Sequence, residues 1–452
     1  MYHYRPLFYF LRYTNPTWYF NLHPEGRVCY FPDCDGLSVD DRALLMPDSS
    51  FQSDAARKAD LSWQAWCKGV IVDENSKALK PELLTFPLID EYRFIRKYFH
   101  SVWSFYVLIL RIFSLNAPWK EISAFFKSKN AKRFKVYEQH KDWVPFIADF
   151  DSDLIRSKPL ISIIIPTLNR YKWLKDVLKD LEMQDYTNFE VLIVDQSEPF
   201  DNSFYEGCNL NLRVWNQKEK ALWKARNDAI ATSAGEFILL YDDDSRVESN
   251  WISWHLKSLD FFKSDISSGV SISVSGDKVP ENYAFFRWSD QLDTGNVLIK
   301  KCVFRQIGLF DRQFEKQRMG DGEFGLRAYL NGFKNISNPQ AKRIHLKVGE
   351  GGLRQMGSWD GWRPKKWWGP RPIPSILYLY RKYFGKTKAI QMLVQNTLQS
   401  LVPYKWKGKT ALIIIMFPFS LFLSPIIFLQ ILVSWNKSSI MLHEGNKIDL
   451  LT

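Results

Sequence analysis

A chain of 452 residues is long enough for about two or three domains, each with its own hydrophobic core. Its hydrophobic fraction of 46% and charged fraction of 24% are typical of a globular protein. The formal charge of +12 favours anionic lipid or phosphorylated ligands as partners, whereas the lack of a long Lys/Arg tract or nucleic-acid-binding module argues against nucleic acid.

Aromatic and cysteine usage narrows the class of protein further. The chain has 18 Trp, and tryptophan suits sugar faces and membrane interfaces alike because its ring is apolar while its N–H stays polar. The five cysteines form an odd, scattered set that indicates reduced thiols; Cys29 and Cys34 lack a second pair at a distance suited to zinc. The N-terminus lacks the basic region and apolar core of a cleaved signal peptide.

Residues 1–90 are predicted to form an accessory region, to which the sequence assigns no role. Aromatic runs at 17–22 and 27–31 flank a His-Pro-Glu-Gly turn, a pattern that favours a β-hairpin. We therefore expect this region to be rich in β-structure.

Residues 91–157 are predicted to be helical. Apolar residues spaced by threes and fours predict one long helix over 91–113. Its most apolar part is too short to span a bilayer and is flanked by Arg96, Lys97 and Arg111. Such a helix either packs against the domain that follows or lies in a membrane interface.

Strands and helices alternate over residues 158–350, which predicts a mostly parallel, Rossmann-like sheet flanked by helices. Apolar runs at 160–165 and 236–241, rich in β-branched or aromatic residues, are typical of strands buried on both faces. Further strands are expected at 189–194, 212–215, 269–275 and 297–299, and helices at 174–181, 219–232 and 322–330.

The C-terminal part is predicted to be a loop and helices over 351–409, followed by a membrane segment over 410–436. Ala411–Trp435 carries no formal charge over about 25 residues, enough to cross a hydrocarbon layer of about 30 Å. Three lysines precede this segment, so the preceding side is expected to be cytoplasmic. Two prolines within it permit a kinked span or a re-entrant hairpin, and a buried core helix is the alternative.

Three consecutive carboxylates, Asp242, Asp243 and Asp244, follow the strand over 236–241. Carboxylates at i and i+2 can hold Mg²⁺ or Mn²⁺ while leaving sites open for phosphate oxygens, although a solvated acidic turn has the same sequence. Asp195 ends another strand, where it could accept a hydrogen bond from a nucleobase. Together these features indicate a nucleotide diphosphate ligand, whose phosphates a metal would neutralise.

Several of these segments resemble glycosyltransferase family 2. The likeness covers residues 158–347 in the order of the family's motifs, carried by Ile161–Arg170, Ala225–Ile230, Ala234–Asp244, Thr294–Asn296, Gly308–Asp311 and Gly320–Arg327. The resemblance implies an α/β fold of the GT-A type and an inverting enzyme that uses a nucleotide sugar as donor. It also implies a divalent metal cofactor, Mn²⁺ or Mg²⁺.

The resemblance assigns roles position by position. Asp242 and Asp244 stand in the DxD positions, and Asp321 falls where the family places the general base that takes the acceptor hydroxyl's proton. The residues expected to bind the nucleotide sugar are Pro166, Thr167, Asn169, Asp195, Arg226, Asn227, Asp242 and Asp243. The expected metal ligands are Asp242, Asp244 and His345, although a lone histidine such as His345 is more often structural.

Two departures from the family pattern leave alternatives open. The second strand ends in Asp195-Gln196-Ser197-Glu198 in place of Asp-Asp-Gly-Ser, which leaves the contacts around the ribose undefined. Gly320 replaces the glutamate that usually precedes the acceptor-side aspartate. Asp321 and Glu323 are therefore rival candidates for the catalytic base.

Four residues are expected on the acceptor side: Gly295, Asn296, Trp359 and Arg363. The last two belong to a loop rich in Trp, Arg and Lys, which lacks the Gln-x-x-Arg-Trp motif of processive members of the family. This loop either closes over phosphate and sugar or forms a packing collar at the membrane surface.

The sequence thus predicts a glycosyltransferase attached to the cell (inner) membrane with its catalytic domain in the cytoplasm. Its expected acceptor is a hydroxyl of a glycan or lipid-linked saccharide in cell-surface polysaccharide synthesis, and membrane lipid is its expected partner. A nucleotidyltransferase is an alternative, although Pro166-Thr167-Leu168-Asn169 is not a Gly-rich phosphate loop. A non-catalytic membrane-bound sugar-binding or partner-binding subunit is the other alternative.

Overall fold

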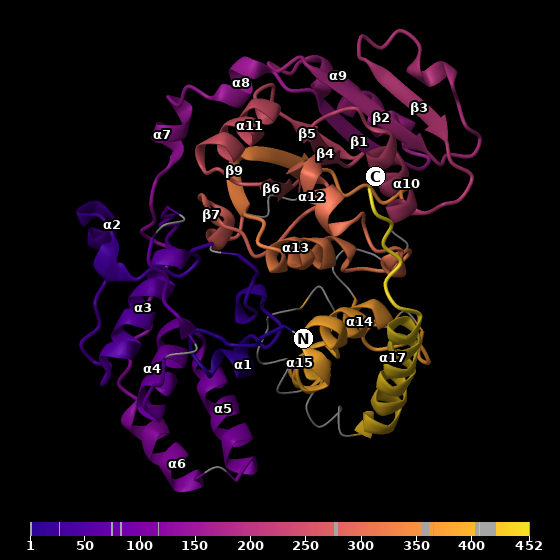
Figure 1. Ribbon diagram of the computed structural model, residues 1–452. Coiled ribbons are helices and arrows are strands. Elements are labelled where there is room, and N and C mark those ends of the chain that lie inside the picture. The colour runs from indigo at the N-terminus through magenta and orange to yellow at the C-terminus, as the bar shows by residue number, and fades with distance from the viewer. Residues whose placement is uncertain are drawn as a thin grey trace. The chain divides into compact units, whose positions relative to one another are not determined.

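The computed structural model divides the chain into two compact units (Figure 1). Unit 1 comprises Met1–Phe150, Val279–Asp290 and Tyr329–Pro339, and unit 2 comprises Asp151–Lys278, Gln291–Ala328 and Gln340–Thr452. The structure describes residues 2–26, 28–73, 76–81, 84–115, 117–274, 279–353, 361–364, 366–402, 406 and 422–451.

Unit 1 is mainly helical where the structure describes it. Its helices are α1 (Leu11–Thr14), α2 (Val39–Ala43), α3 (Asp54–Cys67), α4 (Leu88–Tyr98), α5 (Ser101–Phe113), α6 (Pro118–Lys127) and α7 (Val144–Ala148). The expected β-hairpin over 17–31 and the expected β-rich character of residues 1–90 are wrong. Tyr19–Asn21 is a 3₁₀ turn, and Phe20 packs against Tyr30 at 4.8 Å and against Trp66 of α3 at 5.2 Å between ring centres. The aromatic rings thus pack into a cluster around Phe20. In a β-strand, successive side chains would instead point to opposite faces of a sheet.

The single helix expected over 91–113 is two helices, α4 and α5. Phe99 has an extended backbone conformation (φ −115°, ψ 159°), which ends α4. The side chain of His100 then accepts a hydrogen bond from the backbone N–H of Val102 and caps the start of α5. The apolar spacing continues across this break, so the pattern by itself did not reveal it.

Unit 2 is built around a mixed sheet with the strand order β3-β2-β1-β4-β8-β6-β9-β5. The strands are β1 (Ile161–Thr167), β2 (Phe189–Asp195), β3 (Leu212–Asn216), β4 (Phe237–Tyr241), β5 (Ser245–Val247), β6 (Ile266–Ser273), β8 (Asn296–Lys300) and β9 (Asn335–His345). The two-residue strand β7 (Arg287–Trp288) pairs with the first part of β9 within unit 1.

Four strands of this sheet, β3, β2, β1 and β4, are parallel, and β8 is antiparallel to both β4 and β6. β1, β2 and β4 are buried along their whole length, which explains their continuous apolar sequences. The α/β fold of the GT-A type, with a parallel half and flanking helices, is confirmed.

Helices flank the sheet of unit 2, and the sequence predicted those over 174–181, 219–232 and 322–330 but not the others. The flanking helices are α8 (Asp153–Ser157), α9 (Tyr171–Glu182), α10 (Leu222–Thr232), α11 (Trp251–Phe261), α12 (Lys301–Ile307) and α13 (Gly320–Leu330). α10 packs against β1 and β2, and α11 packs against β6 and β8. The apolar face of α9 buries Leu174, Val177, Leu178 and Leu181, the spacing from which this helix was predicted.

The C-terminal part of unit 2 is a helical cluster of α14 (Pro374–Tyr383), α15 (Gly385–Gln399) and α17 (Ser424–Glu444). Among the described residues, α17 is the one helix whose length and composition would allow it to cross a membrane. It overlaps the second half of the segment predicted at 410–436, of which residues 410–421 lie outside the described part of the chain.

Candidate active site

Three neighbouring parallel strands end at one edge of the sheet, and polar residues follow each of them. β1 ends at Thr167 and β2 at Asp195, and these two residues are paired in the register of the strands. β4, on the other side of β1, leads directly into Asp242, Asp243 and Asp244. Open α/β sheets bind ligands at the carboxyl ends of their strands, so these side chains lie where a ligand is expected.

Asp242, Asp244 and His345 form a cluster suited to a metal ion. Each offers one ligand atom, and these atoms lie within 4.8 Å of one another. The antiparallel pairing of β5 with β9 places His345 opposite Ser245, and His345 Nε2 lies 3.3 Å from Asp244 Oδ1. Carboxylates suit Mn²⁺ and Mg²⁺, whereas an imidazole ligand favours a transition-metal ion, so the set fits Mn²⁺ better than Mg²⁺.

The surroundings of Asp244 favour the ionised form of its carboxyl group. Burial by itself would raise its pKa, but the hydrogen bond with His345 and the positive charge of Arg170 hold the pKa below its ordinary value. Asp244 is therefore ionised at neutral pH, as a carboxylate metal ligand must be.

Two buried arginines hold the side chain of Asp242. Arg226 Nη2 donates to Asp242 Oδ1 at 3.0 Å, and Arg343 Nη1 donates to Oδ2 at 2.8 Å. Arg343 also donates to Asp293 at 2.8 Å, and both guanidinium groups are fully buried. Because a buried charge that loses its partner is costly, these ion pairs fix Asp242 in place.

The predicted contacts of Arg226 and Asn227 with the nucleotide are replaced by structural roles. Besides Asp242, Arg226 bonds the side chain and the carbonyl of Thr294 at 2.8 and 3.0 Å. Asn227 donates to the carbonyl of Phe310 at 2.9 Å and accepts from its N–H at 3.0 Å. Helix α10 thus uses both polar side chains to hold other segments of unit 2.

Asp243 and Arg170 connect the ends of β1 and β4. Asp243 accepts from the hydroxyl of Thr167 at 2.8 Å and from Arg170 Nη1 at 2.9 Å. Arg170 Nη1 also lies 3.1 Å from Asp244 Oδ2. Burial raises the pKa of Asp243 to about 6, against the opposing effect of the Arg170 charge. Asp243 is 4% exposed, so it positions the loop and offers little surface to a nucleotide.

Asp195 lies in a network of tyrosines at the end of β2. Its Oδ2 accepts from the hydroxyls of Tyr171 at 2.7 Å and Tyr205 at 2.8 Å, and its Oδ1 accepts from the N–H of Ser197 at 2.8 Å. Asn169 ties the same loop to β1, because its N–H donates to Ser197 Oγ at 2.7 Å. The loops after β1 and β2 therefore form one bonded surface.

The sequence interpretation missed Arg170, Arg343, Tyr171 and Tyr205. Arg170 stands in the motif after β1, beside an acidic cluster that needs a counter-charge. Arg343 precedes His345 by two residues on β9, and residues two apart in a strand share a face. That period could have placed Arg343 beside the cluster, whereas no local pattern indicates Tyr205.

Residues 162–313 match the family model described as glycosyl transferase family 2. The chain contains a glycosyltransferase family 2 domain.

Curated relatives share parts of this domain. The chain is 26% identical over 198 residues to glycosyltransferase GlyG of Streptococcus pneumoniae. This match covers 42% of this chain and 60% of GlyG. It is 28% identical over 186 residues to poly(ribitol-phosphate) beta-N-acetylglucosaminyltransferase TarS of Staphylococcus aureus. This match covers 38% of this chain and 32% of TarS. The chain therefore spans less than two thirds of the length of either relative.

The chain also matches solved structures, at lower sequence identity. The structure of S. aureus TarS 1–349 in complex with UDP-GlcNAc has a TM-score of 0.38 and 22% identity, over 53% of this chain and 70% of that chain. The mannosyltransferase PcManGT from Pyrobaculum calidifontis, in complex with GDP-Man and Mn²⁺, has a TM-score of 0.39 and 14% identity, over 66% of this chain and 91% of that chain.

On the acceptor side of the family 2 domain, Gly295 is packed against the metal cluster and Asn296 is a buried structural residue. A Cβ atom at Gly295 would lie 2.2 Å from Asp242 Oδ2 and 2.1 Å from Arg343 Nη1. Asn296 is 0% exposed, and its amide bonds Trp251, His255 and two backbone carbonyl groups. The predicted contact of Asn296 with the acceptor is therefore wrong.

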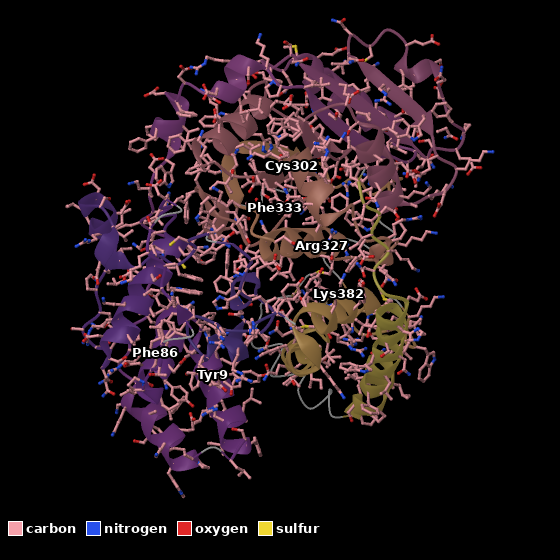
Figure 2. The ribbon with its side chains drawn as sticks, viewed as in Figure 1. Tyr9, Phe86, Cys302, Arg327, Phe333 and Lys382 are labelled. Carbon is pink, nitrogen blue, oxygen red and sulfur yellow. The ribbon has the colours of Figure 1, made fainter. Side chains whose placement is uncertain are left out.

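The structure separates the two candidate bases on α13. Glu323 is 0% exposed; it accepts from Arg327 at 3.1 Å and from the hydroxyl of Tyr383, and Lys382 Nζ lies 3.4 Å away (Figure 2). Burial by itself would raise the pKa of Glu323, but the charges of Arg327 and Lys382 hold it below its ordinary value. Asp321, in the first turn of the helix, is only half-buried.

The glycine that replaces the family's glutamate has a steric explanation. A Cβ atom at Gly320 would lie 2.4 Å from the indole ring of Trp223. Trp223 in turn lies over Arg226, whose guanidinium carbon is 5.3 Å from the ring centre. Because Arg226 bonds Asp242, only two side chains separate the start of α13 from the metal cluster.

Of the loop residues predicted to contact the acceptor, Trp359 lies outside the described residues. Arg363 Nε donates to the carbonyl of Val402 at 2.7 Å, and its Nη2 donates to that of Gln399, the last residue of α15, at 3.1 Å. Arg363 therefore caps the C-terminal end of α15, and its predicted role toward the acceptor stays a prediction.

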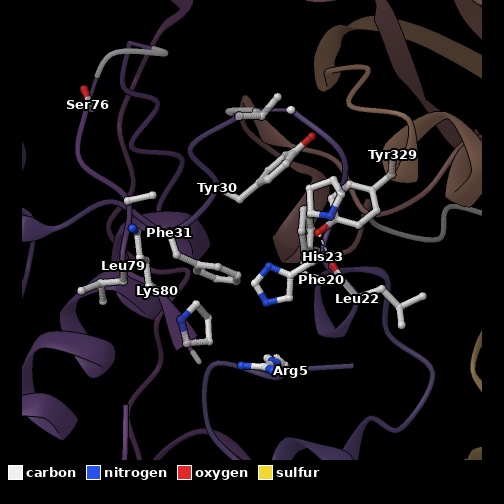
Figure 3. Close-up of a pocket in the computed structure, with 15 residues that line it drawn as sticks. Arg5, Phe20, Leu22, His23, Tyr30, Phe31, Ser76, Leu79, Lys80 and Tyr329 are labelled. Atoms are coloured by element: carbon white, nitrogen blue, oxygen red, sulfur yellow. Dashed lines mark hydrogen bonds between the residues drawn. The ribbon is translucent and has the colours of Figure 1, made fainter. Parts of the chain in front are cut away.

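A cavity of about 430 Å³ lies in unit 1, outside the family 2 domain (Figure 3). Aromatic rings from Phe20, Tyr30, Phe31 and Tyr329 line it, and among the residues that the structure describes no carboxylate does so. The acidic cluster of unit 2 is not part of this cavity.

Proposed function

We propose that the protein is a metal-dependent, inverting glycosyltransferase that moves a sugar from a nucleotide-diphosphate sugar to a hydroxyl of a glycan or lipid-linked saccharide. The observation that carries this proposal is the convergence of Asp242, Asp244 and His345 at the carboxyl edge of the parallel strands. A divalent metal bound there would neutralise the diphosphate of the leaving nucleotide.

In the proposed reaction Asp321 is the general base. Its carboxylate accepts the proton of the acceptor hydroxyl as that oxygen bonds to the anomeric carbon of the donor sugar. The bond from the anomeric carbon to the diphosphate oxygen breaks, and the nucleoside diphosphate leaves with the electron pair. This single displacement inverts the anomeric configuration. The contact of Trp223 with both Gly320 and Arg226 supports the placement of Asp321 near the metal cluster.

We assign the nucleotide to the surface formed by the loops after β1 and β2. Asn169 and Tyr171 border it with exposed or partly exposed side chains, whereas Pro166, Thr167 and Asp195 are buried and support these loops from beneath. The hydrogen bonds between these loops support the assignment, because a surface fixed before binding loses less entropy when the ligand binds.

Cell-surface polysaccharide synthesis at the inner membrane is the proposed setting, with the family 2 domain on the cytoplasmic side. One relative is named a putative colanic acid biosynthesis glycosyl transferase, WcaA of Escherichia coli, and is 33% identical over 104 residues, 37% of its length. Only 28% of the most apolar stretch of α17 is buried, which favours contact with lipid over a core helix.

Release of nucleoside diphosphate from a panel of nucleotide sugars tests the proposal. The full chain, purified in detergent, is assayed with and without Mn²⁺ beside Asp244→Asn and an exposed-site control, Asp54→Asn. We expect metal-dependent release from one donor, lost in Asp244→Asn and retained in the control.

Two results would overturn the proposed enzyme. Transfer of a nucleotidyl group with release of inorganic diphosphate would indicate a nucleotidyltransferase. No release from any donor, together with no heat on titration of nucleoside diphosphates with Mn²⁺, would indicate a binding subunit without a nucleotide site.

A further inference from the structure

One face of helix α5 in unit 1 is apolar and exposed. Val102, Phe105, Ile109 and Phe113 are spaced by three and four residues along it, so they form a single stripe. Phe105 is 56% exposed and Phe113 is 80% exposed, whereas Val107 on the opposite face is fully buried. Helix α5 therefore has two apolar faces, and unit 1 covers only one of them.

Large apolar side chains are also exposed in the connection to α6 and on that helix. Leu115 and Trp119 are each 82% exposed, and Phe126 of α6 is 61% exposed. Single exposed apolar residues are ordinary, but large contiguous patches on soluble proteins mark interaction sites. We call this set of residues, from Val102 to Phe126, the hairpin patch.

Buried polar contacts hold the two helices of the hairpin in place. Arg111 of α5 donates through Nε to Glu121 of α6 at 2.8 Å, and the hydroxyl of Tyr92 on α4 donates to the other carboxylate oxygen at 2.9 Å. Glu121 is 0% exposed, so this pairing is shielded from solvent. The hairpin patch is consequently displayed by a fixed scaffold and not by a loose end of the chain.

The charge around the hairpin patch has one sign. Residues 101–133 include six Lys or Arg and one acid, Glu121, which is buried. Lys120, Lys127 and Lys129 are exposed and have no ion pair with any residue that the structure describes. An apolar face rich in Phe and Trp and bordered by lysines is complementary to a bilayer surface with anionic headgroups.

We propose that the α5–α6 hairpin inserts the hairpin patch into the interfacial layer of an anionic lipid bilayer. With 13 residues, α5 is too short to span the hydrocarbon core, so the hairpin lies in one leaflet. This contact is separate from the predicted C-terminal membrane segment and does not depend on the proposed glycosyl transfer.

An environment-sensitive fluorophore at residue 113 tests the insertion. Phe113→Cys is labelled in a full chain that carries Cys208→Ser and Cys302→Ser, since the remaining cysteines are buried. The matched control is Val39→Cys, which is 84% exposed on α2 of the same unit and stands beside two aspartates. Both proteins are reconstituted into vesicles of phosphatidylcholine with or without phosphatidylglycerol.

We expect the emission of the label at 113 to shift to shorter wavelength in anionic vesicles and to be quenched by spin-labelled lipid, with neither effect at 39. Lys120→Gln, Lys127→Gln and Lys129→Gln should shift the insertion equilibrium toward water by about fivefold for each lysine removed. Because all three side chains are exposed, circular dichroism should show an unchanged fold.

The C-terminal segment alone can keep the protein on vesicles, so only the local signal at 113 decides. Equal, water-like emission at 113 and 39 in anionic vesicles would overturn the proposal. So would a shift at 113 that depends on protein concentration and not on lipid, because that result indicates self-association. Donor hydrolysis by the same preparation reports separately on the proposed transfer reaction.

Discussion

At the scale of single residues, burial distinguishes the two carboxylates of α13. Glu323 is neutralised by Arg327 and Lys382 inside unit 2, whereas Asp321 retains access to solvent. A general base must reach the proton that it removes, so access decides between two acids that the sequence left open. Glu323 then holds α13 against α14, which carries Lys382 and Tyr383.

We expect Asp321→Asn to lower kcat for transfer by about 10²–10⁴-fold and to leave the affinity for nucleoside diphosphate unchanged. Glu323→Gln is the informative comparison. It should lower the free energy of unfolding by up to about 3–5 kcal/mol, because it leaves the buried guanidinium of Arg327 without its carboxylate partner, whereas Lys382 keeps Asp311. Single-turnover transfer assays and thermal unfolding of both variants measure the two effects. Loss of kcat in Glu323→Gln at an unchanged Tm would contradict this assignment.

The close packing around Gly295 leads to a second prediction about a single residue. A methyl group there would overlap both Asp242 and Arg343, so Gly295→Ala should displace the Asp242 carboxylate and weaken Mn²⁺ binding. Overpacking of this kind typically costs about 1–3 kcal/mol of stability. Calorimetric titration with Mn²⁺ and thermal unfolding measure the effects. Gly36→Ala is the control, because a Cβ atom there meets nothing within 4 Å. An unchanged Mn²⁺ affinity in Gly295→Ala would show that Asp242 does not ligate the metal.

At the scale of elements, a buried histidine joins α11 to β6 and β8. His255 is 0% exposed; its Nδ1 lies 2.9 Å from the hydroxyl of Ser267, and its Nε2 lies 3.1 Å from Asn296 Oδ1. Burial lowers the pKa of His255 from 6.5 to about 4. The imidazole is therefore neutral in the folded protein, with Nε2 as donor to Asn296.

This pKa predicts acid sensitivity. Between pH 6.5 and about 4 the unfolded chain binds a proton at His255 that the folded protein does not bind, so stability falls as the pH falls through this range. The contribution of the one group is up to about 3 kcal/mol. Urea unfolding at several pH values should show a shallower loss of stability for His255→Gln than for the wild-type protein. Parallel pH profiles would show that His255 does not titrate in this way.

The elements that the sequence predicted well are those with a strong local period. β1, β2 and β4 have mostly apolar sequences, and α9 has a clear amphipathic spacing. The break between α4 and α5 was missed because the apolar spacing continues across Phe99 and His100. The aromatic run at 17–22 was misread as a strand because ring packing in three dimensions leaves no two-residue alternation.

At the scale of the whole molecule, the division into units follows contacts that sequence order hides. Val279–Asp290 lies between two motifs of the family 2 domain in the sequence and Tyr329–Pro339 follows its last motif, yet both segments belong to unit 1. In the candidate site, the acids were predicted because they follow strands. Arg343 and Tyr205 were missed because their partners, Asp242 and Asp195, are distant or irregularly spaced in sequence.

From this division into units we predict which segments ligand binding protects from hydrogen exchange. Every residue that we assign to metal and donor lies in unit 2, and each unit has its own buried residues. A ligand that binds only the folded state stabilises it by about 2.7 kcal/mol at a concentration of 100 times its Kd. Mn²⁺ with a nucleoside diphosphate should therefore slow hydrogen exchange in β1, β2, β4 and the loops that follow them, and leave α3 and α4 of unit 1 unchanged.

The comparison with Asp244→Asn makes that experiment decisive for the location of the site. If Asp244 ligates the metal, the protection in unit 2 should disappear in the variant while its exchange without ligand stays that of the wild type. Protection confined to unit 1 would place the nucleotide outside the acidic cluster. The aromatic cavity there would then be the alternative site, because Arg5 and Lys80 are among its lining residues and can attract a phosphate.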